Sequence, residues 1–185
     1  MKLPPGKSPG PILCFTSGTR ILTPGGERRI DALHAGDLVI TEDAGPLPIL
    51  WHGTTTVRAS GEFAPIRFAR DTMGNMRDLI VSPDHRVLIN KSRHDEALAS
   101  ALSLVDNYRV TIDYGGMVTY HHILFDRPHI IFAEGMANES FRPCDAVIET
   151  LGDQARDALF QACPMLRTGG GQARRPVRPL LTKVS

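Results

Sequence analysis

The feature that most constrains the fold is a succession of short strand-like segments between Cys14 and about Phe141. These segments are rich in Val, Ile, Thr and aromatic residues, and each is bounded by Gly, Pro, Asp or Asn. Examples are "TRILTPGGERRI", "DLVIT", "PILWHGTTTVRA", "RDLIVS", "RVLIN" and "MVTYHHILF". Since no long helical pattern separates them, the sequence predicts a mostly β fold of short antiparallel hairpins.

Helical patterns occur in two places. The segment "RHDEALASALSLVDN" carries Leu98, Leu102 and Val105 at helical spacing, which predicts a short helix within the β region. After Pro143, the segment "CDAVIETLGDQARDALFQACPMLR" carries an apolar stripe interrupted by Gly152. The second pattern predicts a small C-terminal helical extension of two short helices or one kinked helix.

These patterns divide the chain into four parts. A length of 185 residues fits one domain with an appended element. The start is rich in Pro and Gly, and the stretch "TGGGQARRPVRP" has the composition of a linker. We therefore expect a flexible lead-in over 1–13, a β domain over 14–142, a helical extension over 143–167 and a linker-like tail over 168–185.

Composition and charge narrow the classes of partner. The chain has 42% hydrophobic and 22% charged residues, as a soluble globular domain does. A net charge of +1 gives no reason to expect nucleic acid as a partner. No apolar run reaches the roughly 18 residues that a membrane span needs, and the start lacks the apolar stretch of a signal peptide. We expect no membrane span and a cytoplasmic location.

The cysteines do not form a disulfide framework or a zinc pattern. The chain has three, Cys14, Cys144 and Cys163, and none of them belongs to a CxxC pair. Histidines do not supply the pattern either, because His121 and His122 are consecutive and face opposite sides of a strand. The sequence therefore predicts no metal site and no cofactor.

Residues suited to acyl chemistry occur in three separated segments. Cys14 lies in "ILCFTSGTR", where a thiol can act as a nucleophile. In "LIVSPDHRVLI" the proline excludes an ordinary inner strand, so Ser82 and His85 are expected on a turn that projects a hydroxyl and an imidazole. The third segment, "VTYHHILFDRPHIIFAEG", contributes histidines. A thiol with imidazoles nearby supports nucleophilic catalysis, and the candidate residues are Cys14, Ser82, His85, His122 and His129.

The order of these motifs resembles a known family. A Cys-Phe pair is followed by Gly-Thr-Arg-Ile, by Gly26, "RIDAL" and "AGDLVIT", and later by a Ser-x-x-His turn. Together they resemble the Hint domain shared by inteins and the C-terminal domains of hedgehog proteins, over about residues 13–142. The stretches "VSPDHRVL" and "YHHILFDRPHIIFAEGMANESF" are similar to a bacterial stand-alone branch of that superfamily.

The resemblance implies a reaction at the Leu13-Cys14 bond. In Hint domains the first cysteine attacks the preceding carbonyl and converts a peptide bond into a thioester. His85 matches the histidine that protonates the departing nitrogen, and Ser82 matches the hydroxyl residue that holds the scissile unit. For the later steps, His122 stands where inteins have an aspartate, Asp126 is off register, and His129 matches the second conserved histidine.

The same comparison argues against full splicing. Asn138 lacks a preceding histidine and a following nucleophile, so the implied activity is thioester formation and cleavage by water or an external thiol. The substrate would be the protein's own N-terminal segment, processed in a single turnover rather than by a turnover enzyme. One alternative is a catalytically inactive Hint-fold binding or scaffold module, in which Cys14 is a buried structural residue. A third, a cysteine hydrolase acting on other molecules, lacks a recognisable nucleophile turn.

Overall fold

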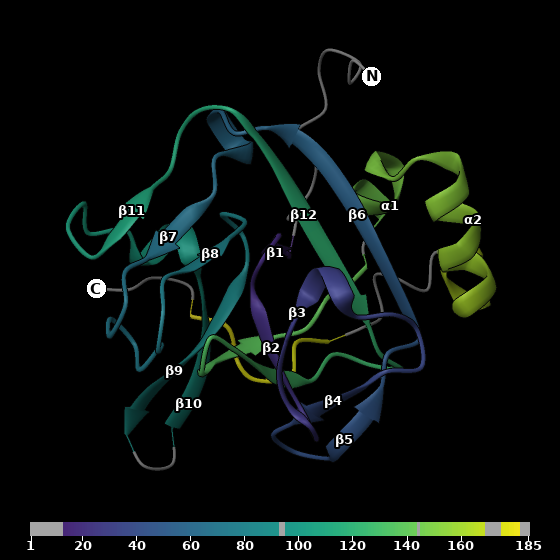
Figure 1. The fold of residues 1–185 in the computed structure, drawn as a ribbon, viewed down its shortest axis with the longest axis horizontal. Helices are drawn as coiled ribbons and strands as arrows, with labels where there is room; N and C mark the ends of the chain where they lie inside the picture. Colours follow the sequence, from purple (N-terminus) through teal and green to yellow (C-terminus); the bar gives the residue numbers. More distant parts are fainter. Residues whose placement is uncertain (1–12, 93–94, 144, 169–174, 182–185) are drawn as a thin grey trace.

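The prediction of a mostly β fold built from antiparallel hairpins is confirmed. The structure, a computed structural model, describes residues 13–92, 95–143, 145–168 and 175–181 (Figure 1). In these ranges six strands form one sheet, in the spatial order β11 (Val110–Ile112), β7 (Ile66–Phe68), β8 (Leu79–Val81), β1 (Phe15–Thr16), β12 (Met117–Leu124) and β6 (Trp51–Arg58). All their pairings are antiparallel.

A second sheet packs against the first across an apolar core. Its path runs through β10 (Asp95–Ser100), β9 (Arg86–Ser92), β14 (Met136–Glu139), β13 (Ile130–Ala133), β2 (Arg20–Thr23) and β3 (Gly26–Arg29). Two further strands, β4 (Leu38–Thr41) and β5 (Gly45–Pro48), form a hairpin that pairs with β13. The core between the sheets includes Ile21, Ile66, Val81 and Ile131.

The register of three strands in the first sheet positions the candidate residues. β6 and β12 pair over their full length, and this pairing sets His122 opposite Gly53. β1 lies between β12 and β8, with Phe15 opposite both His121 and Val81. Cys14 directly precedes β1, so it lies beside the end of β8 and beside the His122 side chain.

The helix expected over residues 93–107 is wrong for residues 95–107, and residues 93 and 94 lie outside the part of the chain that the structure describes. Residues 95–100 form β10, which pairs with β9, and residues 101–104 form a short 3-10 helix, η3 (Ala101–Leu104). The Leu98 N–H donates to the Pro179 carbonyl at 2.8 Å, and the Leu98 carbonyl accepts from the Leu181 N–H at 2.9 Å. Pairing on both edges outweighs the helical spacing of the three apolar residues, since tertiary contacts override local preference.

The C-terminal helices cover the first sheet. Figure 1 shows α1 (Asp145–Thr150) and α2 (Asp153–Ala162) beside β6, and a 3-10 helix, η4 (Pro164–Thr168), follows them. Leu151 and Leu159 are buried in one apolar cluster with Trp51 and Tyr120. The helices thus cover the face of the sheet that carries the Cys14 side chain. None of the described helices is long and apolar enough to span a membrane.

Part of the segment expected as a linker-like tail contacts the β domain. Within residues 175–181, the Arg178 guanidinium bonds to the Asp43 carboxylate at 2.7 Å and to Glu96 at 2.6 Å. The Val177 N–H donates to the buried Glu139 carboxylate at 3.0 Å. This segment therefore bridges β10 and the turn between β4 and β5.

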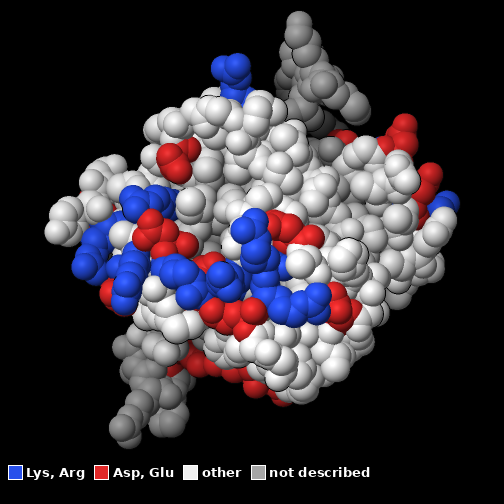
Figure 2. Space-filling view, in the orientation of Figure 1, with Lys and Arg blue, Asp and Glu red and all other residues white. Residues whose placement is uncertain are grey.

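Charged side chains of both signs share the surface. Figure 2 shows Lys and Arg interspersed with Asp and Glu in a band across one face. Ion pairs join Arg28 to Asp37 at 3.1 Å and Arg29 to Asp31 at 2.6 Å. At both pairs the positive charge of the guanidinium is compensated by a neighbouring carboxylate.

Candidate active site

Ser82 holds the backbone of Cys14. The chain turns after β8 at Pro83, and this turn is closed by the His85 N–H, which donates to the Ser82 carbonyl at 3.0 Å. The Cys14 N–H donates to Ser82 Oγ at 3.0 Å. The Cys14 carbonyl accepts from the Ser82 N–H at 3.0 Å and from the Ser82 hydroxyl at 3.3 Å. Ser82 therefore fixes the peptide groups on both sides of the Cys14 side chain.

The thiol of Cys14 contacts His122. The Cys14 Sγ lies 2.8 Å from His122 Nδ1, and both residues are fully buried. Burial lowers the pKa of His122 to about 3, so its imidazole is neutral near pH 7. The Thr55 Oγ1 lies 3.2 Å from His122 Nε2. With the proton on Nε2 directed at Thr55, Nδ1 has the lone pair that accepts the thiol proton.

His85 contacts Phe15, the residue that follows Cys14. Its ring packs edge-on against Phe15 with 4.4 Å between the ring centroids, and its Nε2 lies 3.2 Å from Asn138 Oδ1. An amide oxygen only accepts, so Nε2 carries the proton. Burial lowers the pKa of His85 to about 3. Among the described residues, His85 Nδ1 is the one buried side-chain nitrogen or oxygen that has no hydrogen-bond partner.

His129 is not brought into this group. Its Nε2 lies 3.0 Å from Asp126 Oδ1, its ring packs edge-on against Phe125, and its N–H donates to Ser140 Oγ at 3.0 Å. Asp126, expected off register, is thus the partner of His129. Of the five candidates, Ser82 and His122 each contact Cys14, and His85 lies on the same turn as Ser82.

Several neighbours of His122 were not predicted from the sequence. The His122 ring packs against Phe141, with centroids 4.7 Å apart, and against Trp51 at 6.2 Å. Thr55 comes from β6 and lies close to His122 because the two strands pair. Thr55 is 67 positions from His122 in the sequence, and Trp51 and Phe141 have no reactive group. Their closeness to His122 arises only when the chain folds, so the sequence did not indicate it.

His121 and His122 face opposite sides of β12, as their adjacency predicts. Whereas His122 contacts Cys14, His121 contacts Ser17 and His52, so the two imidazoles serve separate sites. In the part of the chain that the structure describes, no group of three or more His, Cys, Asp or Glu side chains is placed to hold a metal ion.

Comparison with known proteins identifies a family. A family model described as the Hint domain matches residues 13–145. No curated protein matches. Similar solved structures include an intein-like domain from Clostridium thermocellum, with 14% identity, 70% of this chain and 99% of that chain covered, and a TM-score of 0.49.

Two inteins are among the other similar structures. For the MchDnaB-1 intein the identity is 12%, the coverage is 69% of this chain and 99% of that chain, and the TM-score is 0.47. For the gp41-1 intein the identity is 12%, the coverage is 68% and 96%, and the TM-score is 0.44. The family model spans most of the chain and begins at Leu13, next to the cysteine that the geometry singles out. This protein belongs to the Hint-domain family.

Proposed function

We propose that the protein is a self-processing domain in which the Cys14 thiol takes over the acyl group of Leu13, without full splicing. The observation that carries the proposal is the 2.8 Å contact between Cys14 Sγ and the neutral His122, at a residue whose backbone is held on both sides by Ser82. Family membership supports it.

The proposed step is an N-to-S acyl shift. His122 Nδ1 accepts the thiol proton while Sγ attacks the Leu13 carbonyl carbon. The new carbon–sulfur bond replaces the carbon–nitrogen bond, and the Cys14 nitrogen leaves with a proton as an amine. The thiol proton lost and the amine proton gained balance, so the products are a thioester at Cys14 and an amine on the same residue.

His85 is the group that we assign to the departing nitrogen. Its Nδ1 is buried and has no hydrogen-bond partner. A polar atom in that state lowers stability, so its presence in the fold points to a function. Asn138 holds the Nε2 proton, so proton exchange is directed to Nδ1. Because the neutral ring has no proton on Nδ1, His85 must first take up there the proton that the thiol releases through His122, and then pass it to the Cys14 nitrogen.

Asn138 is held in a way that disfavours cyclisation. Its Nδ2 donates to the Met136 carbonyl at 2.6 Å, and its Oδ1 lies against His85. Cyclisation needs the amide nitrogen to attack the residue's own carbonyl, which would break the contact with Met136 within β14 and the contact with His85 on the turn before β9. We therefore expect the thioester to be resolved by water or an external thiol.

The decisive experiment measures intact mass. A reporter domain is fused ahead of Met1, and the purified fusion is incubated with and without dithiothreitol. We expect cleavage at Leu13-Cys14 that dithiothreitol accelerates, that Cys14→Ala abolishes and that His122→Gln slows by about 100-fold. The matched control Cys163→Ala, which alters another buried cysteine, should cleave like the parent. An unchanged fusion mass under both conditions would overturn the proposal.

Burial at the site favours a second candidate, an inactive Hint fold used for binding or as a scaffold. Leu13 is 2% exposed and Cys14 is 0% exposed, so neither the scissile carbonyl nor the thiol is open to an external nucleophile. Iodoacetamide distinguishes the two candidates. If Cys14 stays unmodified in the folded protein and the fusion stays intact, the scaffold role is the better explanation.

A further inference from the structure

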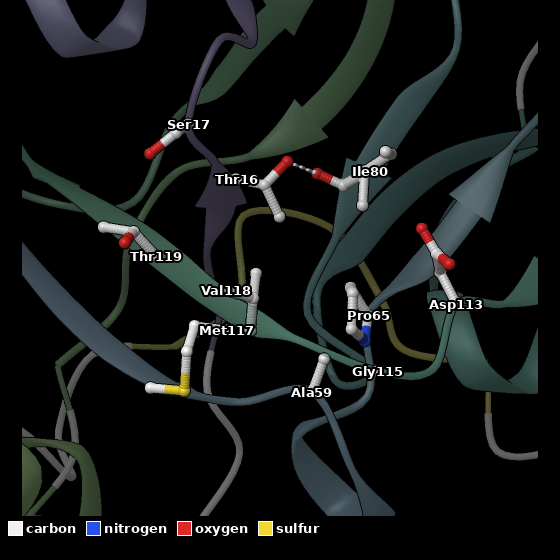
Figure 3. A pocket seen from close by; sticks show the side chains of 10 residues that line it. All are labelled: Thr16, Ser17, Ala59, Pro65, Ile80, Asp113, Gly115, Met117, Val118 and Thr119. Carbon is white, nitrogen blue, oxygen red and sulfur yellow. Dashed lines mark hydrogen bonds between the residues drawn. The ribbon is translucent and has the colours of Figure 1, made fainter.

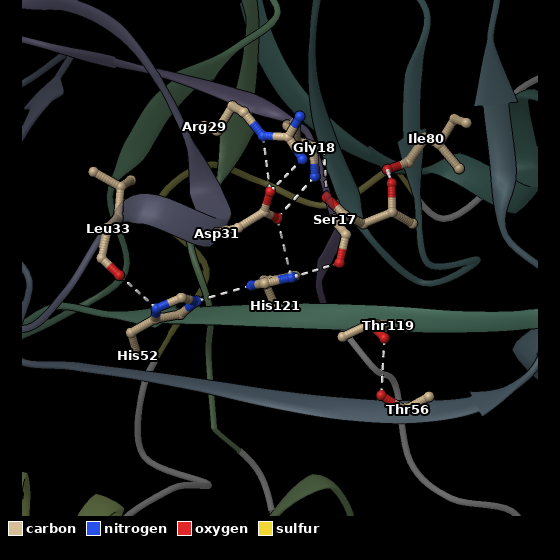
Figure 4. Close-up of polar contacts among 12 residues, drawn as sticks. Ser17, Gly18, Arg29, Asp31, Leu33, His52, Thr56, Ile80, Thr119 and His121 are labelled. Carbon is tan, nitrogen blue, oxygen red and sulfur yellow. Dashed lines mark hydrogen bonds and ion pairs between the residues drawn. The ribbon is translucent and has the colours of Figure 1, made fainter.

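A second nucleophile and histidine pair lies on the opposite face of β12. Figure 4 shows Ser17, immediately after β1, pointing at His121, which in turn points at His52 of β6. The Ser17 Oγ lies 2.8 Å from His121 Nε2, and His121 Nδ1 lies 3.0 Å from His52 Nε2. The row ends at the Leu33 carbonyl, 2.8 Å from His52 Nδ1. Neither imidazole takes part in the proposed chemistry at Cys14.

The carbonyl at the end of this row fixes the position of every proton in it. A carbonyl only accepts, so His52 Nδ1 is protonated and donates to Leu33. Burial lowers the pKa of His52, so the ring is neutral and its Nε2 accepts from His121 Nδ1. Burial, with His52 beside it, lowers the pKa of His121 to about 4. His121 Nε2 is therefore left as a lone pair aimed at the Ser17 hydroxyl, as in a general base.

A carboxylate is placed to stabilise the charge that forms when His121 accepts a proton. Asp31 Oδ1 lies 3.5 Å from His121 Nε2. Asp31 is itself held in position, by the Gly18 N–H at 2.9 Å and by the Arg29 guanidinium at 2.6 Å. An anion at this distance favours the imidazolium over the neutral ring. The arrangement thus offers both a base for the hydroxyl and a counter-charge for the protonated base.

Ser17 is accessible and borders a small pocket. The Ser17 residue is exposed, whereas His121 is only 5% exposed. β1 ends at Thr16, and where it ends a pocket of about 270 Å³ opens between β8 and β12 (Figure 3). Ile80 and Thr119 line it together with Ser17, and the exposed Asp113 carboxylate lies at its far end. The volume suits a small ligand, and the carboxylate disfavours an anionic one.

We propose that Ser17 is an activated nucleophile that accepts the acyl group of small, uncharged or cationic esters, with His121 as the general base and His52 as a positioning residue. The Ser17 oxygen forms a bond to the acyl carbon as the ester carbon–oxygen bond breaks. The serine proton passes to His121 Nε2 and then to the departing alcohol. Water, deprotonated by the same imidazole, releases the acid and restores Ser17.

The test uses covalent labelling of the Cys14→Ala protein, in which the nearby thiol cannot compete and the acyl shift cannot occur. The probes are a small alkyl fluorophosphonate and p-nitrophenyl acetate. We expect one adduct, mapped by peptide mass to Ser17, and its loss in Ser17→Ala. His121→Gln should slow labelling by about 100-fold. The control Ser103→Ala removes an exposed hydroxyl that faces a backbone carbonyl instead of a histidine, and should label normally.

His52 is tested by rescue. His52→Gln keeps an oxygen that can accept from His121 Nδ1, whereas His52→Leu does not, so the Gln variant should label faster than the Leu variant at equal thermal stability. Two results would overturn the proposal. One is an adduct spread over several serines, and the other is a Ser17 labelling rate that His121→Gln leaves unchanged in a protein with parental circular dichroism.

Discussion

At the scale of single residues, the position of Cys14 depends on one hydroxyl. Ser82 is fully buried and both accepts from the Cys14 N–H and donates to the Cys14 carbonyl. Ser82→Ala removes the side-chain partner of a buried N–H, which should lower the free energy of unfolding by about 1–3 kcal/mol. Urea unfolding measures the loss. Ser103→Ala, at an exposed serine, should change stability by less than about 0.5 kcal/mol. Equal stabilities of the two variants would contradict the role given to Ser82.

How far single residues could be predicted depends on whether they carry reactive groups. Cys14, Ser82 and His122 are predictable because a thiol, a hydroxyl on a turn and an imidazole suit acyl chemistry, and the fold brings Ser82 and His122 to Cys14. Thr55 and Leu33 have no such signature. Each acts by completing the hydrogen bonds of a histidine, so its contribution exists only once the strands have paired.

At the scale of elements, the alternation of side chains between the two faces of a strand was predictable from the sequence, and the register between paired strands was not. The adjacency of His121 and His122 alone indicates that they face opposite sides of a strand. Which nucleophile each one meets depends on the pairing of β12 with β1 and β6, where residues more than 60 positions apart lie opposite each other. The strand β10 shows the same limit, because its partners are β9 and the distant residues 179–181.

Within β6, the ring of Trp51 explains the glycine two residues later. A Cβ at Gly53 would lie 2.1 Å from the Trp51 ring, so the indole lies directly over this position. Trp51 in turn packs beside His122 and Phe141. Gly53→Ala must displace the indole and should lower the free energy of unfolding by about 1–3 kcal/mol.

Fluorescence measures that displacement directly. Trp51 is the single tryptophan of the chain, so its emission should shift to the red in Gly53→Ala. The control Gly25→Ala adds a Cβ with no atom within 4 Å and should leave both stability and emission unchanged. Parental emission in a stable Gly53→Ala protein would show that the ring does not occupy this position.

At the scale of the whole molecule, the two sheets and the helices enclose imidazoles that must stay neutral. His85 lies between the sheets, and His122 lies under the cluster that includes Trp51 and the C-terminal helices. Both are fully buried, and burial lowers both pKa values to about 3, from 6.5. The stability of the folded protein therefore depends on pH, because the burial that lowers these pKa values requires both sheets and the helices.

The sign of that dependence follows from which state binds the proton. Below about pH 6.5 the unfolded chain protonates these histidines and the folded protein does not, so stability is present at neutral pH and is lost as the pH falls toward 3. Each of the two histidines contributes about 1.4 kcal/mol per pH unit over that range, so lowering the pH from 7 to 5 should remove about 4 kcal/mol together. His52 and His121 shift in the same direction.

Urea unfolding at pH 7 and pH 5 tests this directly. His122→Gln should be less stable than the parent at pH 7 but should lose about 2 kcal/mol less between the two pH values, because one buried imidazole is gone. His34→Gln is the matched control, since the His34 ring is 79% exposed, and it should keep the parental difference. If the parent were as stable at pH 5 as at pH 7, the folded protein would have to bind these protons as readily as the unfolded chain, and the lowered pKa values of His85 and His122 would be wrong.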